Sequence, residues 1–509
     1  MDLMTVKKGL KSFDVCINQQ AEQPVDIEFT LPDYCPKIEK IIKCTLTPRI
    51  NSVSYSGTGV TAEGETEIAI LYCAFEGGRL FGYETGVQFS KNIDAGTDCD
   101  RMIISCEARP EYVNCRAVNE RKLDVHGAVT LNFTGMENTD MQVVTDSDDD
   151  KLQLLKQEIE NVSLCGCASK QFIIEQELEI PQTLDNIENI IRKNADIHIH
   201  EVKIVANKAV IKGELSVNMM YDTAKGECET FDSSIPFEQM TDVDNCSEND
   251  IVTADPTLCS FKIKTYTDSN GECRSVYISA KVNVDIKCMR AETMTVVSDC
   301  YSITNELSVA REQITLKCCS QPVSAVHQLR ETLEFGSGTL GKVIDVSCDV
   351  GKISERLEDG VMKINGLCTV FIIAADESGS IMCYDKNLPF DHEFNIDGDC
   401  DFDADVRADI ESCSYSIKSS SELELRATIK IAGFVFCKRN MQIITDITAA
   451  DSEKPRADMP ALILYYAKQG ESIWDIAMRY NTAKDMIRDA NSLEDDVLAE
   501  DKILMIPGM

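Results

Sequence analysis

One hexapeptide is written three times in this chain of 509 residues: Met-Gln-Val-Val-Thr-Asp at 141–146, Met-Thr-Val-Val-Ser-Asp at 294–299 and Met-Gln-Ile-Ile-Thr-Asp at 441–446. The copies begin 153 and 147 residues apart. This period is far longer than a solenoid unit of about 20 to 50 residues, and it is long enough for a domain with its own core. The sequence therefore predicts three tandem copies of one domain, and an array of similar domains indicates binding rather than catalysis.

A strand precedes each hexapeptide. Apolar residues occupy alternate positions, with one small residue at the same point of each copy, which is typical of a strand that buries one face. The positions are Leu123, Val125, Gly127, Val129 and Leu131 in copy one, Val276, Ile278, Ala280, Val282 and Val284 in copy two, and Leu423, Leu425, Ala427, Ile429 and Ile431 in copy three. The pattern favours sheet-rich domains.

Near the start of each copy the apolar spacing changes to i, i+3, i+4, which is typical of a helix. The triads are Ile38, Ile41 and Ile42, then Ile187, Ile190 and Ile191, then Leu340, Val343 and Ile344. We therefore expect one short helix per copy, packed on the sheet. Pro32 and Pro181 precede the first two triads, and Tyr72 and Tyr221 end the strands that follow, whereas copy three lacks these prolines and tyrosines.

The predicted fold class is mainly β, of the α+β type, with three tandem β-rich repeat domains, each carrying a short helix, and a small C-terminal βααβ unit. The predicted boundaries are 1–24 for an N-terminal segment, 25–146 for repeat one, 147–169 for an acidic and helical linker, 170–300 for repeat two, 301–325 for a second linker, 326–447 for repeat three, 448–461 for a third linker and 462–509 for the C-terminal unit.

The chain is strongly acidic, with 86 Asp and Glu against 50 Lys and Arg and a net charge of −36. This charge repels nucleic-acid phosphates and anionic lipid headgroups, and it leaves no release of counterions to drive binding to either. No run approaches the roughly 18 apolar residues that a membrane-spanning helix needs. The composition therefore argues against nucleic acid and membrane insertion.

The segment 1–10 lacks the apolar stretch of a secretory signal, so we expect a cytosolic protein. The 23 cysteines are scattered, without a Cys-x-x-Cys pair, and several, such as Cys73, Cys368 and Cys437, fall at apolar positions of predicted strands. They are interpreted as reduced core thiols. Cys165-Gly-Cys167 has no partner ligand at a known spacing, so the sequence assigns no metal site.

The stretch Gly336-Ser-Gly-Thr-Leu-Gly-Lys-Val343 comes close to a phosphate-binding loop, but Val343 stands where a Ser or Thr hydroxyl would hold magnesium. It also aligns with the apolar triads of the other copies, so its glycines are interpreted as an entry to the predicted helix. The chain contains no Gly-x-Ser-x-Gly and no His-Glu-x-x-His signature. The sequence therefore predicts no catalytic residue, no cofactor and no enzyme activity.

The C-terminal unit has a different pattern. It predicts a strand, a turn at Gly470, a helix with Ser472 as N-cap, a second helix around Met486-Ile487 and a final strand at 503–507. This unit closely resembles a LysM domain. The resemblance is carried by Gly470-Glu-Ser-Ile-Trp474, Ile476-Ala477, Tyr480, Asn491 and Leu493.

LysM domains are known to bind polymers of N-acetylglucosamine in a shallow groove between the first strand–helix loop and the second helix–strand loop. The resemblance therefore implies a groove made of Gly470, Glu471, Ser472, Ile473, Asn491, Ser492 and Leu493. This chain departs from the family at Glu500-Asp501, where Pro-Gly usually precedes the last strand. These carboxylates add negative charge beside a site for a neutral sugar.

Three β-rich copies followed by one LysM unit resemble the SipL-type spore-envelope proteins of clostridia, whose repeats are called SPOCS domains. The resemblance covers about residues 25–508. It implies a sporulation adaptor in the mother-cell cytosol, at the forespore surface and spore coat, which binds a coat morphogenetic ATPase (SpoIVA-like) and other coat proteins. The alternatives are a peptidoglycan-binding protein that acts through LysM, and self-assembly through open strand edges. The sequence does not predict the arrangement of the repeats, the oligomeric state or which repeat contacts which partner.

Overall fold

The protein is mainly β, as predicted. The computed structural model describes residues 4–75, 79–99, 102–149, 151–267, 271–335, 340–358, 360–377, 379–396, 401–453 and 461–508, without the side chains of 319–320 and 451–453. Repeat one contains β1 (Thr5–Thr30), β2 (Ile38–Ser56), β3 (Gly59–Ala74), β4 (Leu80–Asp94), β5 (Ile103–Ala117) and β6 (Lys122–Ser147).

Repeats two and three have the same order of strands. Repeat two contains β7 (Leu152–Glu179), β8 (Ile187–Val205), β9 (Lys208–Thr223), β10 (Cys228–Asp242), β11 (Ile251–Thr267) and β12 (Cys273–Ser302). Repeat three contains β13 (Asn305–Glu334), β14 (Leu340–Val350), β15 (Ser354–Glu358), β16 (Val361–Asp376), β17 (Ile381–Asn395), β18 (Asp401–Ser419) and β19 (Glu422–Glu453). In repeat three, β14 and β15 together take the place that β2 has in repeat one.

Each repeat is a sandwich of two antiparallel sheets. In repeat one, β2, β3 and β4 form one sheet, and β6 lies between β1 and β5 in the other. The alternating residues of β6 that the sequence singled out lie on its inner face, where Leu123, Val125 and Leu131 are fully buried. They pack against Ile68 and Tyr72 of β3, so the two sheets share a single hydrophobic core.

The predicted short helices are wrong. Ile38, Ile41 and Ile42 lie in β2, and the pairing of β2 with β3 is interrupted by bulges between Ile38 and Lys40 and between Ile41 and Lys43. A bulge adds one residue to a strand and restarts the alternation. Two bulges in succession therefore give the i, i+3 spacing that resembles a helix. The same pair of bulges recurs in β8 and β14.

The helical linker at 147–169 is also wrong, because β7 occupies 152–179 and pairs with β12 along its whole length. The segment 1–24 lies largely in β1, and β13 begins inside the predicted linker at 301–325. The short-range pattern of 151–162 fits a helix, but the partner strand satisfies the backbone groups of β7 and decides the structure. Residues 454–460 of the third predicted linker, and Gly336–Thr339 of the glycine-rich stretch, lie outside the described residues.

The prediction of reduced thiols holds for Cys73 and Cys368, which are free, and is wrong for Cys437, which is disulfide-bonded.

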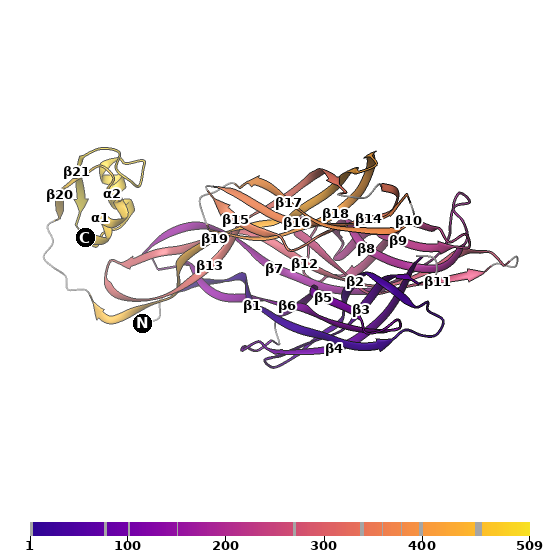
Figure 1. The fold of residues 1–509 in the computed structure, drawn as a ribbon. Helices are drawn as coiled ribbons and strands as arrows, with labels where there is room; N and C mark the ends of the chain where they lie inside the picture. The colour runs from indigo at the N-terminus through magenta and orange to yellow at the C-terminus, as the bar shows by residue number, and fades with distance from the viewer. Residues whose placement is uncertain are drawn as a thin grey trace.

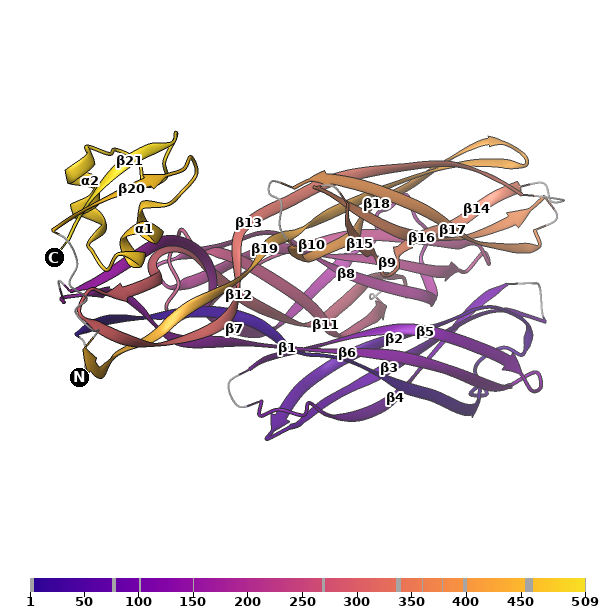
Figure 2. The ribbon, with the colours of Figure 1, turned by 90° about the vertical axis from the view of Figure 1, so that its left-hand side faces the viewer.

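The three repeats do not form a linear array. Their long antiparallel strand pairs, β1 with β6, β7 with β12 and β13 with β19, converge at the end of the molecule that carries the C-terminal unit, as Figures 1 and 2 show. The three hexapeptides meet there, and Val143, Val296 and Ile443 share one buried cluster although they belong to different repeats. Leu10, Ile159, Ile314 and Leu316 complete this cluster, which we call the shared core.

A ring of ion pairs surrounds the shared core. The last residue of each hexapeptide is an aspartate, and each aspartate pairs with a basic residue of the following repeat, the third with the first. The pairs are Asp146 with Lys156 at 2.7 Å, Asp299 with Arg311 at 2.9 Å and Asp446 with Lys7 at 2.7 Å. The three basic residues occupy equivalent positions in β1, β7 and β13, so the chain closes into an internal pseudo-trimer.

The contact between repeats continues along the same axis. Glu107, Asp255 and Arg407 occupy equivalent positions in β5, β11 and β18, and Arg407 reaches Glu107 at 3.3 Å and Asp255 at 3.1 Å. One cation between two carboxylates is an arrangement that three identical repeats could not make.

Among the described residues, no helix has the length and hydropathy needed to cross a membrane.

Candidate functional site

The C-terminal unit has the predicted order of strand, two helices and strand. Its elements are β20 (Leu462–Ala467), α1 (Ile473–Arg479), α2 (Lys484–Asn491) and β21 (Lys502–Pro507), and β20 pairs antiparallel with β21. Ser472 caps α1, as predicted, by accepting a hydrogen bond from the Trp474 N–H at 3.2 Å. Ile473, Ile476 and Ala477 are buried beneath the sheet, so the helix packs by its apolar face.

The first predicted groove loop, Gly470–Ile473, is bonded to the segment that precedes β21. The Gly470 N–H donates to the Leu498 carbonyl at 2.8 Å, and Ser472 forms a β-bridge with Val497. Gly470 has a φ of 85°, and no atom lies within 4 Å of the place where a Cβ would stand. Gly470 and Ser472 therefore lie at the surface, whereas Ile473 is fully buried in the core of the unit.

Glu471 is held by its own domain. Its carboxylate accepts hydrogen bonds from the Lys468 N–H at 3.0 Å and from the Tyr465 hydroxyl at 3.0 Å, and Arg479 donates to the same hydroxyl. The bond from the Lys468 backbone, with the Tyr465 hydroxyl and the Arg479 charge as further causes, lowers the pKa of Glu471. The carboxylate is therefore charged at neutral pH and fixed in position.

The second predicted groove loop, Asn491–Leu493, also has structural roles. The Asn491 amide donates to the Met505 carbonyl and accepts from the Met505 N–H, both at 2.7 Å, and so joins the end of α2 to β21. Ser492 adopts a left-handed conformation, and Leu493 packs against the core. The segment that follows, Glu494-Asp495-Asp496, makes this side of the unit acidic.

The unit is docked on repeat two, which sequence reasoning missed. The Trp474 indole donates to Asp299 at 3.0 Å, and its ring meets Tyr301 edge to face with centroids 4.9 Å apart. The Tyr301 hydroxyl donates to the Thr482 carbonyl at 2.7 Å. Since Asp299 ends the second hexapeptide, the three-fold ring of the repeats also provides the contact for the C-terminal unit.

The outer face of the β20–β21 sheet is exposed and apolar. Its five large side chains are 42% to 68% exposed, and they are Leu462, Leu464, Tyr466, Ile503 and Met505. Leu464 lies opposite Met505 and Tyr466 opposite Ile503 in the strand register, so the side chains form one continuous strip. We call this strip the outer face. A contiguous apolar patch of this kind is typical of a binding surface.

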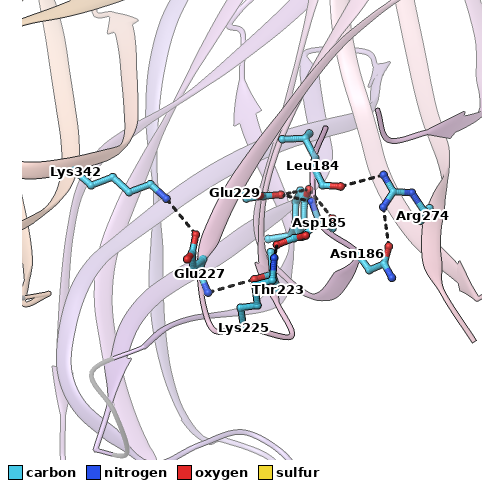
Figure 3. A network of polar contacts seen from close by, with 10 residues as sticks. Leu184, Asp185, Asn186, Thr223, Lys225, Glu227, Glu229, Arg274 and Lys342 are labelled. Atoms are coloured by element: carbon cyan, nitrogen blue, oxygen red, sulfur yellow. Dashed lines mark hydrogen bonds and ion pairs between the residues drawn. The ribbon is translucent and has the colours of Figure 1, made fainter. Parts of the chain in front are cut away.

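A second candidate region lies at the other end of repeat two, where Arg274 holds the loop between β7 and β8 (Figure 3). Its guanidinium donates to the Asn186 side chain at 2.7 Å, to the Leu184 carbonyl at 3.0 Å and to the Pro181 carbonyl at 2.7 Å. Glu229 supports the same loop, since it accepts from the Asp185 N–H at 2.8 Å. We call this arrangement the arginine clamp.

Repeat one has an equivalent clamp, in which Arg121 donates to the carbonyls of Pro32 and Cys35, each at 3.0 Å. In repeat three Ser421 stands at this position. The Phe335 N–H donates to its carbonyl at 2.9 Å, a backbone bond that the Arg121 and Arg274 carbonyls also accept, so repeat three keeps this bond without the guanidinium. Sequence reasoning missed both arginines. The signal was present, because each arginine lies two residues before the alternating strand in copies one and two and is absent from copy three.

Comparison with protein families separates the β-rich repeats from the C-terminal unit. The family model SipL, SPOCS domain, matches residues 37–133 and 186–266, which lie in repeats one and two. The LysM domain model matches residues 465–507. Neither the curated proteins nor the solved structures gave a match. The match to the SipL model does not extend to repeat three, the copy without the prolines, the tyrosines and the clamp.

The two family models identify the same combination as the resemblance drawn from the sequence motifs. SPOCS domains are found in sporulation proteins, and LysM domains are found in proteins that bind peptidoglycan. The chain is thus similar to SipL-type proteins, in that two segments match the SPOCS domain and a C-terminal segment matches the LysM domain.

Proposed function

We propose that this protein is a non-enzymatic adaptor that assembles the spore coat around the forespore, from the cytosol of the mother cell. In this proposal the LysM domain binds a coat morphogenetic ATPase of the SpoIVA type, and the SPOCS repeats contact other coat proteins. The family resemblance suggests the partners. The outer face of the LysM domain is the observation that carries the proposal.

The outer face suits a protein partner better than a sugar polymer. It presents aliphatic and aromatic side chains, Leu464, Tyr466 and Ile503 among them, which bury well against another protein. The helical side of the domain is already engaged, since Trp474 and Tyr301 dock it on repeat two. The LysM domain is therefore held at one end of the body with its apolar sheet directed outward, as a docking module requires.

Binding of peptidoglycan is the second candidate. The exposed backbone at Gly470 favours it, because nothing near this residue would obstruct a polymer. The acidic segment 494–496 and the internal hydrogen bonds of Glu471 and Asn491 weigh against it, since few polar groups of the predicted groove are left for a sugar. The two candidates use different faces of the domain and can be separated by substitution.

The test is capture of the purified ATPase by the full-length chain. We expect the double substitution Leu464→Ser and Tyr466→Ser to lower the affinity about tenfold or more, since it removes two anchors from the outer face. The matched control is Tyr415→Ser with Ile417→Ser, two residues of β18 that are 43% and 51% exposed. Both variants should keep the thermal stability of the parent.

Sedimentation with purified peptidoglycan is the second arm of the test. If the outer-face variant and a chain that ends at residue 460 both capture the ATPase as well as the parent, the proposed partner site is wrong. Sedimentation of the parent chain with peptidoglycan that is lost on changing Ser472 to a larger residue, together with no capture of the ATPase, would establish the sugar-binding alternative.

A further inference from the structure

Three ligand atoms of the kind that bind thiophilic metals converge in repeat two, far from the LysM domain in sequence. They belong to Cys165 of β7 and to Cys246 and Asp250 of the loop between β10 and β11, and all lie within 4.8 Å of one another. The two sulfurs are 3.9 Å apart, and the Cys165 sulfur is 3.5 Å from an Asp250 carboxylate oxygen. Two sulfur ligands of tetrahedral zinc are separated by about 3.8 Å, given a Zn–S bond of about 2.3 Å.

A third thiol lies beside this group. Cys288 of β12 is fully buried and lies near Cys246, although its sulfur is not one of the three ligand atoms that all lie within 4.8 Å of one another. Three thiolates and one carboxylate make a four-ligand set for zinc. Sequence reasoning set Cys165-Gly-Cys167 aside because no partner stands at a known spacing, and the fold supplies the partners from two other segments, the β10–β11 loop and β12.

The backbone around the ligands is shaped to bring them together. Cys165 is the extra residue of a β-bulge, since Leu164 and Gly166 pair with successive residues of β12. A Cβ at Gly166 would stand 2.6 Å from the Cys246 sulfur and 2.5 Å from the Asp244 carbonyl oxygen, so glycine is required for the approach of the loop. Bulges are frequent at functional sites because they redirect a side chain.

Arg290 orients the carboxylate ligand. It donates two hydrogen bonds to Asp250, at 2.9 Å and 2.7 Å, and a third to the Asn245 carbonyl, while the Ser247 N–H also donates to Asp250. Asn245 itself has a φ of 61°, a left-handed conformation that the loop maintains. Carboxylate ligands of metals are usually fixed by hydrogen bonds of this kind from a second layer of residues.

Repeat one has the same bulge without the site. Cys16 is its bulged residue and is exposed, and Ile17 fills the space against Gly135. In repeat two the large and the small residue of this pair change places, because Gly166 stands at the position of Ile17 and Cys288 at the position of Gly135. The small Gly166 leaves the space in which the sulfurs of repeat two approach each other.

We propose that repeat two binds one zinc ion through Cys165, Cys246 and Asp250, with Cys288 as the fourth ligand. With the Cys288 thiolate in the fourth position the ion would be held by protein groups alone, so it would have a structural role and would join β7, the β10–β11 loop and β12. Because a thiol must lose its proton to bind zinc, binding releases protons and weakens as the pH falls.

The first test is alkylation of the full-length chain with N-ethylmaleimide, with and without zinc, read by peptide mass spectrometry. Zinc should slow the labelling of Cys165 about tenfold or more, because a coordinated thiolate is no longer free to react. Cys16, the exposed cysteine of the equivalent bulge, is the internal control and should react at the same rate with and without zinc. Unchanged labelling of Cys165 at saturating zinc would overturn the proposal.

The second test is titration with cobalt, whose sulfur-to-metal charge-transfer absorption reports thiolate ligands. The parent chain should take up one equivalent with this absorption. Cys165→Ser should lose it, and Cys99→Ser, in the corresponding loop of repeat one, should keep it. Absorption that survives in Cys165→Ser at full strength would mean adventitious binding elsewhere. Since Cys165 is partly exposed, its serine variant is expected to fold, which circular dichroism verifies.

Discussion

The two ends of the molecule differ in how strictly the repeats agree. At the end where the long strand pairs converge, all three copies keep the same aspartate and a basic partner in the next repeat, and the three ion pairs form a ring. At the opposite end an arginine clamp holds the loop of repeats one and two, whereas Ser421 replaces this arginine in repeat three. What recurs serves the packing of the repeats on one another, and what varies lies away from that packing.

At the convergent end the symmetry of the three repeats is broken by the contact with the LysM domain. Of the three aspartates, Asp299 receives the Trp474 indole in addition to its ring partner, Arg311. The LysM domain is thereby attached to one repeat of the three. A nearly symmetric body thus carries a single LysM domain, and the contrast between the two ends can be tested by substitution.

The largest effect is expected in the shared core. Val296→Asp places a carboxylate among residues of three repeats at a position with no exposed area. An unpaired buried charge costs about 3 to 5 kcal/mol or more, so the variant should lose most of its cooperative unfolding transition in urea. Val205→Asp, at a 43% exposed position of β8, should change the transition little. If the two variants behaved alike, the repeats would be independent domains.

A smaller effect is expected at the opposite end. Arg274→Ala removes the donors that hold the Pro181, Leu184 and Asn186 groups, and we expect a loss of about 1 to 3 kcal/mol. Hydrogen exchange of the amides at 180–186 should accelerate, while that of the shared core should not. Lys203→Ala, whose ion pair with Glu201 is exposed, is the control. Equal protection of the loop from hydrogen exchange in both variants would show that Arg274 does not hold the loop.

Much of the fold could be predicted from the sequence, because an alternating strand such as 123–131 records which face it buries. The bulges of β2 could not be predicted, since a strand with two bulges and a helix give the same spacing of Ile38, Ile41 and Ile42. The LysM loops were found from their motif, but the motif does not show that Glu471 and Asn491 are bonded within the domain. The ring and the metal ligands depend on contacts between distant segments, which no local pattern contains.

The smallest effects on stability are expected in the ring of ion pairs. They should distinguish Asp146, which contacts a neighbouring repeat, from Asp299, which also contacts the LysM domain. Asp146→Ala removes an ion pair whose side chains are 53% and 41% exposed, so it should cost less than about 1 kcal/mol. Asp299→Ala also removes the acceptor of the Trp474 indole and should cost about 1 kcal/mol more. It should also increase proteolysis between repeat three and the LysM domain, which Asp146→Ala should leave unchanged.

The stabilising effect of the Asp146 charge in the ring should depend on pH. The hydrogen bond from Lys156, with help from the Ser147 N–H, lowers the pKa of Asp146. A carboxylate with a lowered pKa stabilises the fold above its unfolded pKa of about 3.9, and this contribution disappears as the pH falls through the folded value. The difference between the parent and Asp146→Ala should therefore be present at pH 7, shrink below about pH 4 and shrink at high salt. A difference that stayed constant with pH and salt would show that Asp146 acts through packing and not through its charge.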